Sequence, residues 1–394
     1  MKRLMVMGAA IEQVPGIKKA KEMGYKVGVI DYNPNAIGIP LADQYFNVST
    51  IDPEGVLQAA RQFNADGFLT LATDLPMRAV AYACEQMGIP GISQQTALLA
   101  TDKGEMIQAL KKYGVESPWY VVIRSESELK EIAEKISFPC VMKPTDNAAS
   151  RGVVLVHDEK ELLASYEYAR AQSHSGQVIV EEYMVGAEVS VEVLTYQGAS
   201  HVLQITDKIT SGAPHFVEMG HNQPSKLSSE TQVKIRDVAC RAVKALGIHT
   251  GPAHVEIIVT EEGPKIVELG ARLGGDCITS HLVYLSTGID MVCETIKVLC
   301  GEKPDLRPTF EKGAAIRFLT SDKLGVFHHV EGEERIREMN GVIEVSDIMV
   351  PGDLIESIKS SDDRVAYVIT QADLLEDAEK LADDAIALMK VVLN

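Results

Sequence analysis

The sequence contains no apolar run long enough to cross a membrane, which takes about 20 consecutive apolar residues. Its 394 residues are 46% hydrophobic and 24% charged, the balance of an ordinary globular protein. The N-terminal residues MKRLMVMGAA are expected to form a strand that continues into Glu12 and Gln13, and we do not interpret them as a signal peptide. We therefore expect a cytoplasmic protein with no targeting segment and no membrane partner.

The chain is also short of basic residues. It has 38 Lys and Arg against 56 Asp and Glu, a formal net charge of −18. Nucleic-acid binding depends on a basic surface that neutralises phosphates, so this charge argues against nucleic acid as a partner. Any nucleotide site would have to rely on a few local Lys and Arg side chains together with a metal ion.

The six cysteines have neither a CxxC spacing nor a Cys/His spacing typical of a zinc site. We interpret them as reduced, mostly buried thiols without a functional role. They are Cys84, Cys140, Cys240, Cys277, Cys293 and Cys300.

The length suits two or three domains. Residues 1–95 alternate strand and helix patterns, which predicts a Rossmann-like α/β domain with a parallel sheet. Residues 96–302 mix hairpins with helices and predict an α+β domain, with a helical pattern at 96–114 and an irregular stretch at 211–225. Residues 303–394 are expected to form a small C-terminal α/β domain that follows the linker EKPDLRP.

The most informative segment is residues 253–276, AHVEIIVTEEGPKIVELGARLGGD. It has two apolar-rich strand patterns separated by Glu-Glu-Gly at 261–263. A three-residue hairpin loop there would pair Thr260 with Pro264. Carried along the two strands, this register fixes which side chains face one another.

That register places Glu256 directly opposite Glu268. Like charges opposed across two strands are destabilising, but a bound divalent cation reverses the effect, and Mg²⁺ is commonly held by two carboxylates together with substrate phosphates. Arg272, which follows Glu268 closely in the sequence, adds a planar cation beside the same site. The alternative is a solvated hairpin face that carries two unrelated glutamates.

Two lysines and an arginine are candidates for phosphate binding. Lys103 lies near the start of a predicted helix, and Lys143 lies at the end of the strand pattern FPCVMKP, where an ammonium can face a phosphate. The following loop, TDNAASRGV, is rich in small residues that let backbone N–H groups approach an anion, and it contains Arg151. The alternatives are lysines at a sheet edge and a plain polar turn.

The segment EEYMVGAE at residues 181–188 combines a strand end with acidic side chains. The strand pattern is interrupted at Gly186, so the backbone could offer a carbonyl and an N–H to the edge of an adenine. Glu188 could then bind ribose hydroxyls. By itself the segment is equally compatible with an ordinary acidic strand end.

In this order and spacing, the motifs resemble those of the ATP-grasp superfamily, in particular its carboxylate–amine ligases, such as the L-amino-acid ligases, and its biotin-carboxylase-like enzymes. The resemblance covers nearly the whole chain. It implies an ATP-grasp fold in which two α+β subdomains of residues 96–302 clamp ATP, with a lid subdomain at about 115–185 and a closing loop at 145–152.

The resemblance also implies a role for individual side chains. Lys103, Lys143 and Arg151 would bind the phosphates, Glu181, Glu182, Tyr183 and Met184 the adenine, and Glu188 the ribose. Glu256 and Glu268 would hold one or two Mg²⁺ ions. Arg272 would stabilise the transferring phosphoryl group, and Lys208 would be a third phosphate-contacting lysine.

The chain departs from the superfamily pattern at two places. Gly270 stands where many members have an Asn metal ligand, which leaves the number of metal ions open. Ala148 and Ala149 stand where the loop is often glycine-rich. Asp74 falls at a predicted strand end, where we favour a helix-capping or turn role.

The implied reaction phosphorylates a carboxylate with ATP and lets an amine attack the acyl phosphate, with small-molecule acid and amine substrates that we expect to be amino acids. Substrate specificity is assigned to Glu12, Gln13, His215, His221, Gly274 and Gly275. Two alternatives remain: a purine-pathway or biotin-carboxylase-like enzyme that uses formate or bicarbonate, and an ATP-binding regulatory module without catalysis. The oligomeric state is open, a homodimer being common among relatives.

Overall fold

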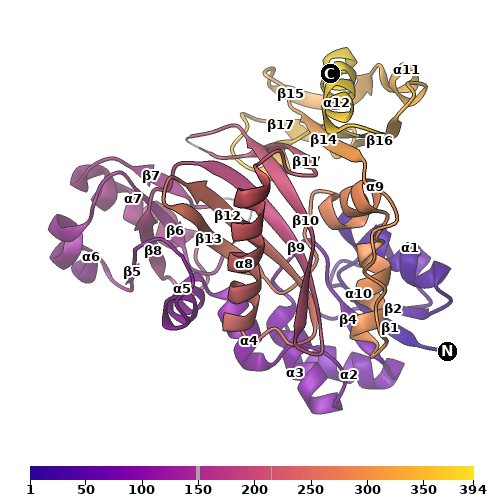
Figure 1. The fold of residues 1–394 in the computed structure, drawn as a ribbon, viewed down its shortest axis with the longest axis horizontal. Coiled ribbons are helices and arrows are strands. Elements are labelled where there is room, and N and C mark those ends of the chain that lie inside the picture. Colours follow the sequence, from indigo (N-terminus) through magenta and orange to yellow (C-terminus); the bar gives the residue numbers. More distant parts are fainter. Residues whose placement is uncertain (148–150, 214) are drawn as a thin grey trace.

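The N-terminal region forms a four-stranded parallel sheet, as the alternating sequence pattern predicted (Figure 1). The computed structural model describes residues 1–147, 151–213 and 215–394. The sheet has the order β3 (Gln44–Phe46), β2 (Lys26–Ile30), β1 (Arg3–Met7), β4 (Gly67–Leu69), and the accompanying helices are α1 (Val14–Glu22), α2 (Pro53–Phe63) and α3 (Met77–Met87). Because parallel strands end at one edge, the loops after β1 and β4 lie on the same side.

A smaller antiparallel sheet projects from the body of the molecule on the left of Figure 1. Its order is β5 (Tyr120–Ile123), β8 (Val178–Glu182), β6 (Cys140–Pro144), β7 (Val154–Val156). Helices α6 (Glu126–Ile132) and α7 (Glu159–Ala171) bury their apolar residues against it. This subdomain therefore has a hydrophobic core of its own.

The centre of the molecule is an eight-stranded antiparallel sheet. Its order is β13 (Gly263–Gly270), β12 (Gly251–Thr260), β9 (Ala187–Tyr196), β10 (Ala199–Thr210), β11 (Glu218–Gln223), β14 (Gly313–Leu319), β18 (Ala366–Ala372), β16 (Val342–Asp347). The prediction that 211–225 is irregular was wrong for β11, whose residues pair with β10 on one side and β14 on the other. This strand has no apolar sequence pattern because it contains polar residues such as His221 and Asn222.

The large sheet crosses the predicted boundary at residue 303, because β14, β16 and β18 extend it beyond β11. Helix α12 (Leu375–Leu388) packs on β14 and β18. The remaining C-terminal elements are α11 (Glu333–Arg337) and a small sheet of β17 (Leu354–Ile355), β15 (Gly325–Glu331) and β19 (Lys390–Leu393). The proposed domain boundaries stay predictions, since a shared sheet joins the regions.

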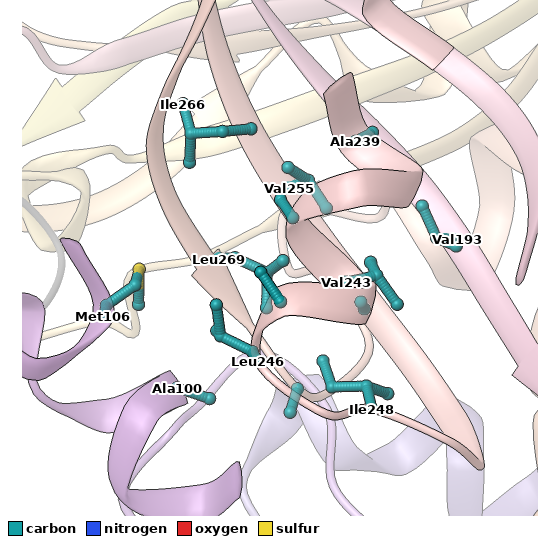
Figure 2. Close-up of a cluster of buried hydrophobic side chains, with 14 of the residues drawn as sticks. Ala100, Met106, Val193, Ala239, Val243, Leu246, Ile248, Val255, Ile266 and Leu269 are labelled. Atoms are coloured by element: carbon teal, nitrogen blue, oxygen red, sulfur yellow. The ribbon is translucent and has the colours of Figure 1, made fainter. Parts of the chain in front are cut away.

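Helix α8 (Ser229–Ala245) covers the half of the large sheet that contains β12 and β13 (Figure 1). Figure 2 shows Val243 and Leu246 from this helix and its C-terminal end beside Val255 and Leu269 from the two strands. Leu246 and Leu269 are each 1% exposed. This core holds the β12–β13 hairpin firmly against the body of the molecule.

The helical pattern at 96–114 corresponds to two helices, α4 (Gln94–Thr101) and α5 (Lys103–Lys112). The break is at Asp102, which has an extended backbone and whose side chain accepts a hydrogen bond from the N–H of Glu105. Such a carboxylate is a strong N-cap. The cap makes Lys103 the first residue of α5 and confirms its predicted place at a helix start.

The chain continues from β13 through a π-helical turn (Ile278–Leu282) into α9 (Val283–Thr287) and α10 (Met291–Leu299). Within the described residues, no helix is both long and apolar enough to span a membrane. All six cysteines are free, and Cys84, Cys140 and Cys300 are buried.

We expect Leu246→Ala to destabilise the protein, because it leaves a cavity between α8 and the hairpin. The loss in free energy of unfolding should be about 2–5 kcal/mol, measured as a lower midpoint of urea denaturation. Leu324→Ala is the control, since Leu324 is 67% exposed. Equal midpoints for the two variants would contradict this packing.

Candidate active site

The β12–β13 hairpin brings Glu256 and Glu268 directly opposite each other, as predicted. The register at the turn is different: Thr260 pairs with Gly263 and Val259 with Pro264, so the predicted Thr260–Pro264 pair was wrong. A bulge between Glu256 and Ile257 takes up the extra residue and restores the expected register at the glutamates. Bulges of this kind commonly re-aim side chains beside functional sites.

Glu256 lies against the ammonium of Lys208, at 2.8 Å from Oε2. The same Lys208 Nζ is 2.6 Å from Glu188 and 3.4 Å from Glu218, and the lysine side chain is only 4% exposed. Burial alone would raise the pKa of Glu256, but the Lys208 ammonium and His254 hold that pKa well below its usual range. Burial alone would lower the pKa of Lys208, which its carboxylate neighbours hold well above its ordinary value.

Glu268 has its own cation, Lys103, whose Nζ is 3.0 Å from Oε2. Lys103 Nζ also donates a 2.7 Å hydrogen bond to the carbonyl of Asn147 in the small subdomain. Burial would raise the pKa of Glu268, whereas Lys103 lowers it, and the net shift is downward. The hairpin glutamates are therefore both ionised and each faces a different lysine.

Beneath Glu256 lies a buried histidine–glutamate pair that sequence reasoning missed. His254 Nδ1 is 2.6 Å from Oε1 of Glu192, and His254 Nε2 is 3.6 Å from Glu256. Burial would lower the pKa of His254, but the charge of Glu192 raises it to about 9. The signal in the sequence was the spacing of two between His254 and Glu256, which puts both on one face of β12.

The second predicted lysine, Lys143, pairs with Glu181 at 2.6 Å across β6 and β8. Glu182 binds Lys265 Nζ at 3.0 Å, and its backbone N–H donates to the carbonyl of Trp119. Tyr183 and Phe216 lie with their ring centroids 6.3 Å apart. The acidic strand end thus carries three different contacts.

These side chains line a cavity of about 490 Å³ between the small sheet and the large sheet. Its lining includes residues 181–188 and Phe216 together with Lys103, Lys143, Lys208, Glu256 and Glu268. A cavity lined by both apolar and charged side chains suits a nucleotide, whose base and phosphates need different surroundings.

A second cavity of about 560 Å³ lies between the large sheet and the N-terminal region. Both cavities are lined by Lys103, Asn147, Arg151, Lys208, Glu218, Glu256 and Glu268. The second one also contains Arg272, Asp74, His221 and Glu12. The two glutamates therefore stand where the two cavities meet.

Arg272 lies in the second cavity with Asp74. Its Nε is 3.2 Å from Asp74 Oδ1, and its Nη2 is 3.1 Å from Asp74 Oδ2. We predicted a capping or turn role for Asp74. The backbone of Asp74 fits this role, because its carbonyl accepts a hydrogen bond from the N–H of Met77. Its carboxylate instead forms a two-point ion pair with a residue 198 positions away, which no local pattern could reveal.

A further ion pair missed in the sequence joins Asp276 to Arg364 of the C-terminal region, at 2.7 and 2.8 Å. His221 Nε2 lies 3.0 Å from Asp276 Oδ2, and Arg364 stacks on the ring of Phe318 at 3.7 Å. Burial would raise the pKa of Asp276, but Arg364 drives it far below the usual range. The C-terminal region thus contributes a wall of the second cavity.

The predicted substrate residues fall into different places. Glu12 and Gly275 line the second cavity. Gln13 lines it too, but its amide is engaged with the backbone of Ala10 and Leu71. His215 is exposed and lies outside the lining of both cavities.

Gly274 does not line either cavity, although it lies beside the hairpin. A Cβ on Gly274 would come within 2.6 Å of His254 Nδ1. The residue is therefore a packing requirement of the His254–Glu192 pair.

Arg151 lines both cavities and donates to Asn147 Oδ1 at 3.2 Å. Ala148 and Ala149, the glycine-poor part of the predicted loop, lie outside the described residues. In the described part of the chain, no three His, Cys, Asp or Glu side chains are grouped to hold a metal ion. Any ion at Glu256 and Glu268 would therefore complete its coordination with phosphate oxygens and water.

Comparison with known proteins agrees with this architecture. Residues 136–280 match the ATP-grasp domain, and residues 317–394 match the L-amino acid ligase C-terminal domain 2. Alanine–anticapsin ligase of Bacillus subtilis is 28% identical over 277 residues, which are 64% of this chain and 58% of that protein. The chain thus spans less than two thirds of that relative.

Two solved structures resemble the whole chain. L-amino acid ligase from Bacillus licheniformis is 25% identical with a TM-score of 0.87, covering 100% of this chain and 99% of that one. Phosphoribosylglycinamide synthetase from Anaerococcus prevotii is 24% identical with a TM-score of 0.81, covering 100% of both chains, and shows the shared fold alone.

The fold, the hairpin site and these matches define the class at the level of domains: the chain carries an ATP-grasp domain at residues 136–280 and an L-amino acid ligase C-terminal domain 2 at residues 317–394.

The His254–Glu192 pair predicts a pH dependence of stability. The folded-state pKa of His254, about 9, exceeds the ordinary 6.5, so its stabilisation is complete below about pH 6.5 and is lost as pH rises through 9. Glu192→Gln removes the main cause of the raised pKa, the charge of Glu192. The difference in melting temperature between wild type and Glu192→Gln should therefore be largest near pH 6 and shrink towards pH 9.5.

Glu230→Gln serves as the control, because Glu230 pairs with Lys234 on an exposed helix face. Its melting temperature should follow that of the wild type at each pH. A Glu192→Gln difference that stays constant from pH 6 to 9.5 would show that His254 does not titrate as stated.

Proposed function

We propose that the protein joins a carboxylate to an amine, both from amino acids, by phosphorylating the carboxylate with ATP and releasing ADP and phosphate. The single observation that carries the proposal is the position of Glu256 and Glu268 at the junction of two cavities, one suited to a nucleotide and one to small polar substrates. The matches to L-amino acid ligases support the choice of amino acids.

The donors that remain on the two lysines support a phosphate role. An ammonium has three N–H donors. Among the described residues, Lys103 uses two, for Glu268 and the Asn147 carbonyl, and Lys143 uses one, for Glu181. Both can therefore bind a phosphate oxygen and keep the carboxylates that orient them.

Lys208 has a different setting, because its three donors face Glu188, Glu256 and Glu218. In the proposed site it holds the ribose-binding and metal-binding carboxylates in place and neutralises them. Contact with a phosphate would require it to exchange one of these partners. Glu188 would bind the ribose, and Glu181, Glu182, Tyr183 and Met184 would surround the adenine.

Mg²⁺ held by Glu256 and Glu268 would neutralise charge on the phosphate oxygens. The fit rests on two opposed, half-buried carboxylates that stay ionised. Arg272, in the adjoining cavity, would face the transferring phosphoryl group from the substrate side, where positioned cations lower the barrier most.

The amine would enter from the cavity lined by Glu12, His221 and Asp276. An acyl phosphate hydrolyses readily, so the site has to exclude water while the amine attacks. The small subdomain can contribute to this, since Asn147 and Arg151 line both cavities.

The decisive experiment is a screen of amino-acid pairs with Mg-ATP, in which ADP, phosphate and product mass are measured. We expect ADP and phosphate only when an acid and an amine are both present, with a product mass equal to their sum minus water. AMP and pyrophosphate would overturn the proposal. Turnover with bicarbonate or formate in place of the acid would support the carboxylase-like alternative instead.

Glu268→Gln should reduce the rate of ADP release about 10²–10³-fold, the usual cost of losing one charge-stabilising group. Glu262→Gln is the matched control, because Glu262 lies at the turn of the same hairpin and its side chain is 77% exposed. It should keep the wild-type rate. A Glu268→Gln variant that releases ADP at the wild-type rate would contradict the metal-binding role proposed for Glu268.

A further inference from the structure

Arg272 is held by Asp74 along one edge of its guanidinium and by a single backbone carbonyl on the other side. Its Nε and Nη2 donate to the two oxygens of Asp74, and Nη1 donates to the carbonyl of Leu273 at 3.3 Å. A guanidinium has five N–H donors, so two remain among the described contacts, one on each terminal nitrogen. This is the pair of donors that binds a carboxylate or phosphate in a two-point manner.

The backbone on both sides of this ion pair is fixed by a bridge between the N-terminal region and the segment after β13. Leu71 and Leu273 form a parallel β-bridge. The N–H of Ala72 donates to the carbonyl of Leu273, and the N–H of Leu273 donates to the carbonyl of Thr70. Asp74 and Arg272 are therefore presented to each other by segments that cannot slide independently.

Gly270 provides the space in which the pair lies. A Cβ at this position would be 2.7 Å from Asp74 Oδ1 and 3.1 Å from the Nε and Cζ atoms of Arg272. Real Cβ atoms essentially never approach an oxygen at 2.7 Å, so any side chain at 270 would have to displace the carboxylate or the guanidinium. The backbone at 270 needs no positive φ, so the requirement for glycine is one of space.

The position of Arg272 depends on the balance between carboxylates on different sides of its guanidinium. Its burial would lower its pKa, but Asp74 and the two metal-site glutamates raise it. Without a partner on the Asp74 side, the guanidinium would be drawn towards Glu256 and Glu268, which attract it from the hairpin. The ion pair with Asp74 thus opposes this attraction and keeps the Arg272 guanidinium on the substrate side.

We propose that Asp74 is the positioning residue for Arg272, and that Gly270 is glycine because the Asp74–Arg272 pair occupies the place of its side chain. The inference rests on the proposed ligase function, in which Arg272 faces the transferring phosphoryl group. It assigns a functional role to a loop of the N-terminal region, which lies far from the hairpin in sequence.

The test is a double-mutant cycle of Asp74→Ala, Gly270→Ala and the double variant. Each single substitution should lower kcat about 10–100-fold, the cost of moving a charged group by roughly 1 Å, while KM for ATP changes less than about 3-fold. In the Asp74→Ala background, Gly270→Ala should cost less than about 3-fold more, because the oxygen it would strike is gone.

Asp74→Asn provides a variant of unchanged shape, which guards against a folding defect in Asp74→Ala. It should retain one hydrogen bond to Arg272 and lose kcat to an intermediate extent. Asp305→Asn is the matched control. Asp305 binds Arg307 through the same Nε and Nη2 atoms on an exposed segment, and its loss should change neither kcat nor KM.

A second readout needs no substrate pair: the affinity of each variant for inorganic phosphate in the presence of MgADP. Asp74→Ala and Gly270→Ala should weaken phosphate binding about 10-fold relative to Asp305→Asn, the size of a lost charge-assisted contact. Wild-type kcat in both single variants, or equal effects of Gly270→Ala in both backgrounds, would overturn the inference. A wild type that binds phosphate but ligates nothing would contradict the proposed function alone.

Discussion

The site depends on the pairing of each buried or half-buried carboxylate with a cation of its own. Glu256 has Lys208, Glu268 has Lys103, Glu181 has Lys143 and Asp276 has Arg364. An unpaired buried charge would cost several kcal/mol, so the acidic groups could not converge without these partners. Two of these pairs also join different parts of the molecule, since Lys103 of α5 binds Glu268 of the hairpin and Arg364 of the C-terminal region binds Asp276.

The large sheet places this network through two local irregularities. The bulge beside Glu256 sets the two hairpin glutamates opposite each other although the turn has a different register. The N-cap at Asp102 interrupts what would be one helix and starts α5 at Lys103. The core beneath α8 then holds the hairpin in position (Figure 2). The bulge and the N-cap, both departures from regular structure, thus place Glu256 and Lys103 at the junction of the cavities.

Much of the fold was predictable because the sequence patterns that produce it are periodic and local. The parallel N-terminal sheet followed from alternating strand and helix patterns, and the glutamate hairpin from two apolar strands around Glu-Glu-Gly. Strand β11 was missed because its residues are polar yet lie in the middle of a sheet, where pairing with β10 and β14 outweighs intrinsic preference. Likewise, Asp74 was interpreted only as a capping or turn residue, and Glu192 and Arg364 were not noticed, since each acquires its role from a partner distant in sequence.

The sequence by itself determined the kinds of element, the hairpin with its opposed glutamates, the lysines at their helix and strand ends and the resemblance to the ATP-grasp superfamily, because these depend on spacing along one chain. Only the tertiary structure decided which cation each carboxylate meets, that the C-terminal strands extend the central sheet, and that the space beside Gly270 is filled by Asp74 and Arg272. Electrostatic pairing acts through space between residues far apart in the chain, 198 positions in the case of Asp74 and Arg272, and no pattern of neighbours along the chain records such a contact.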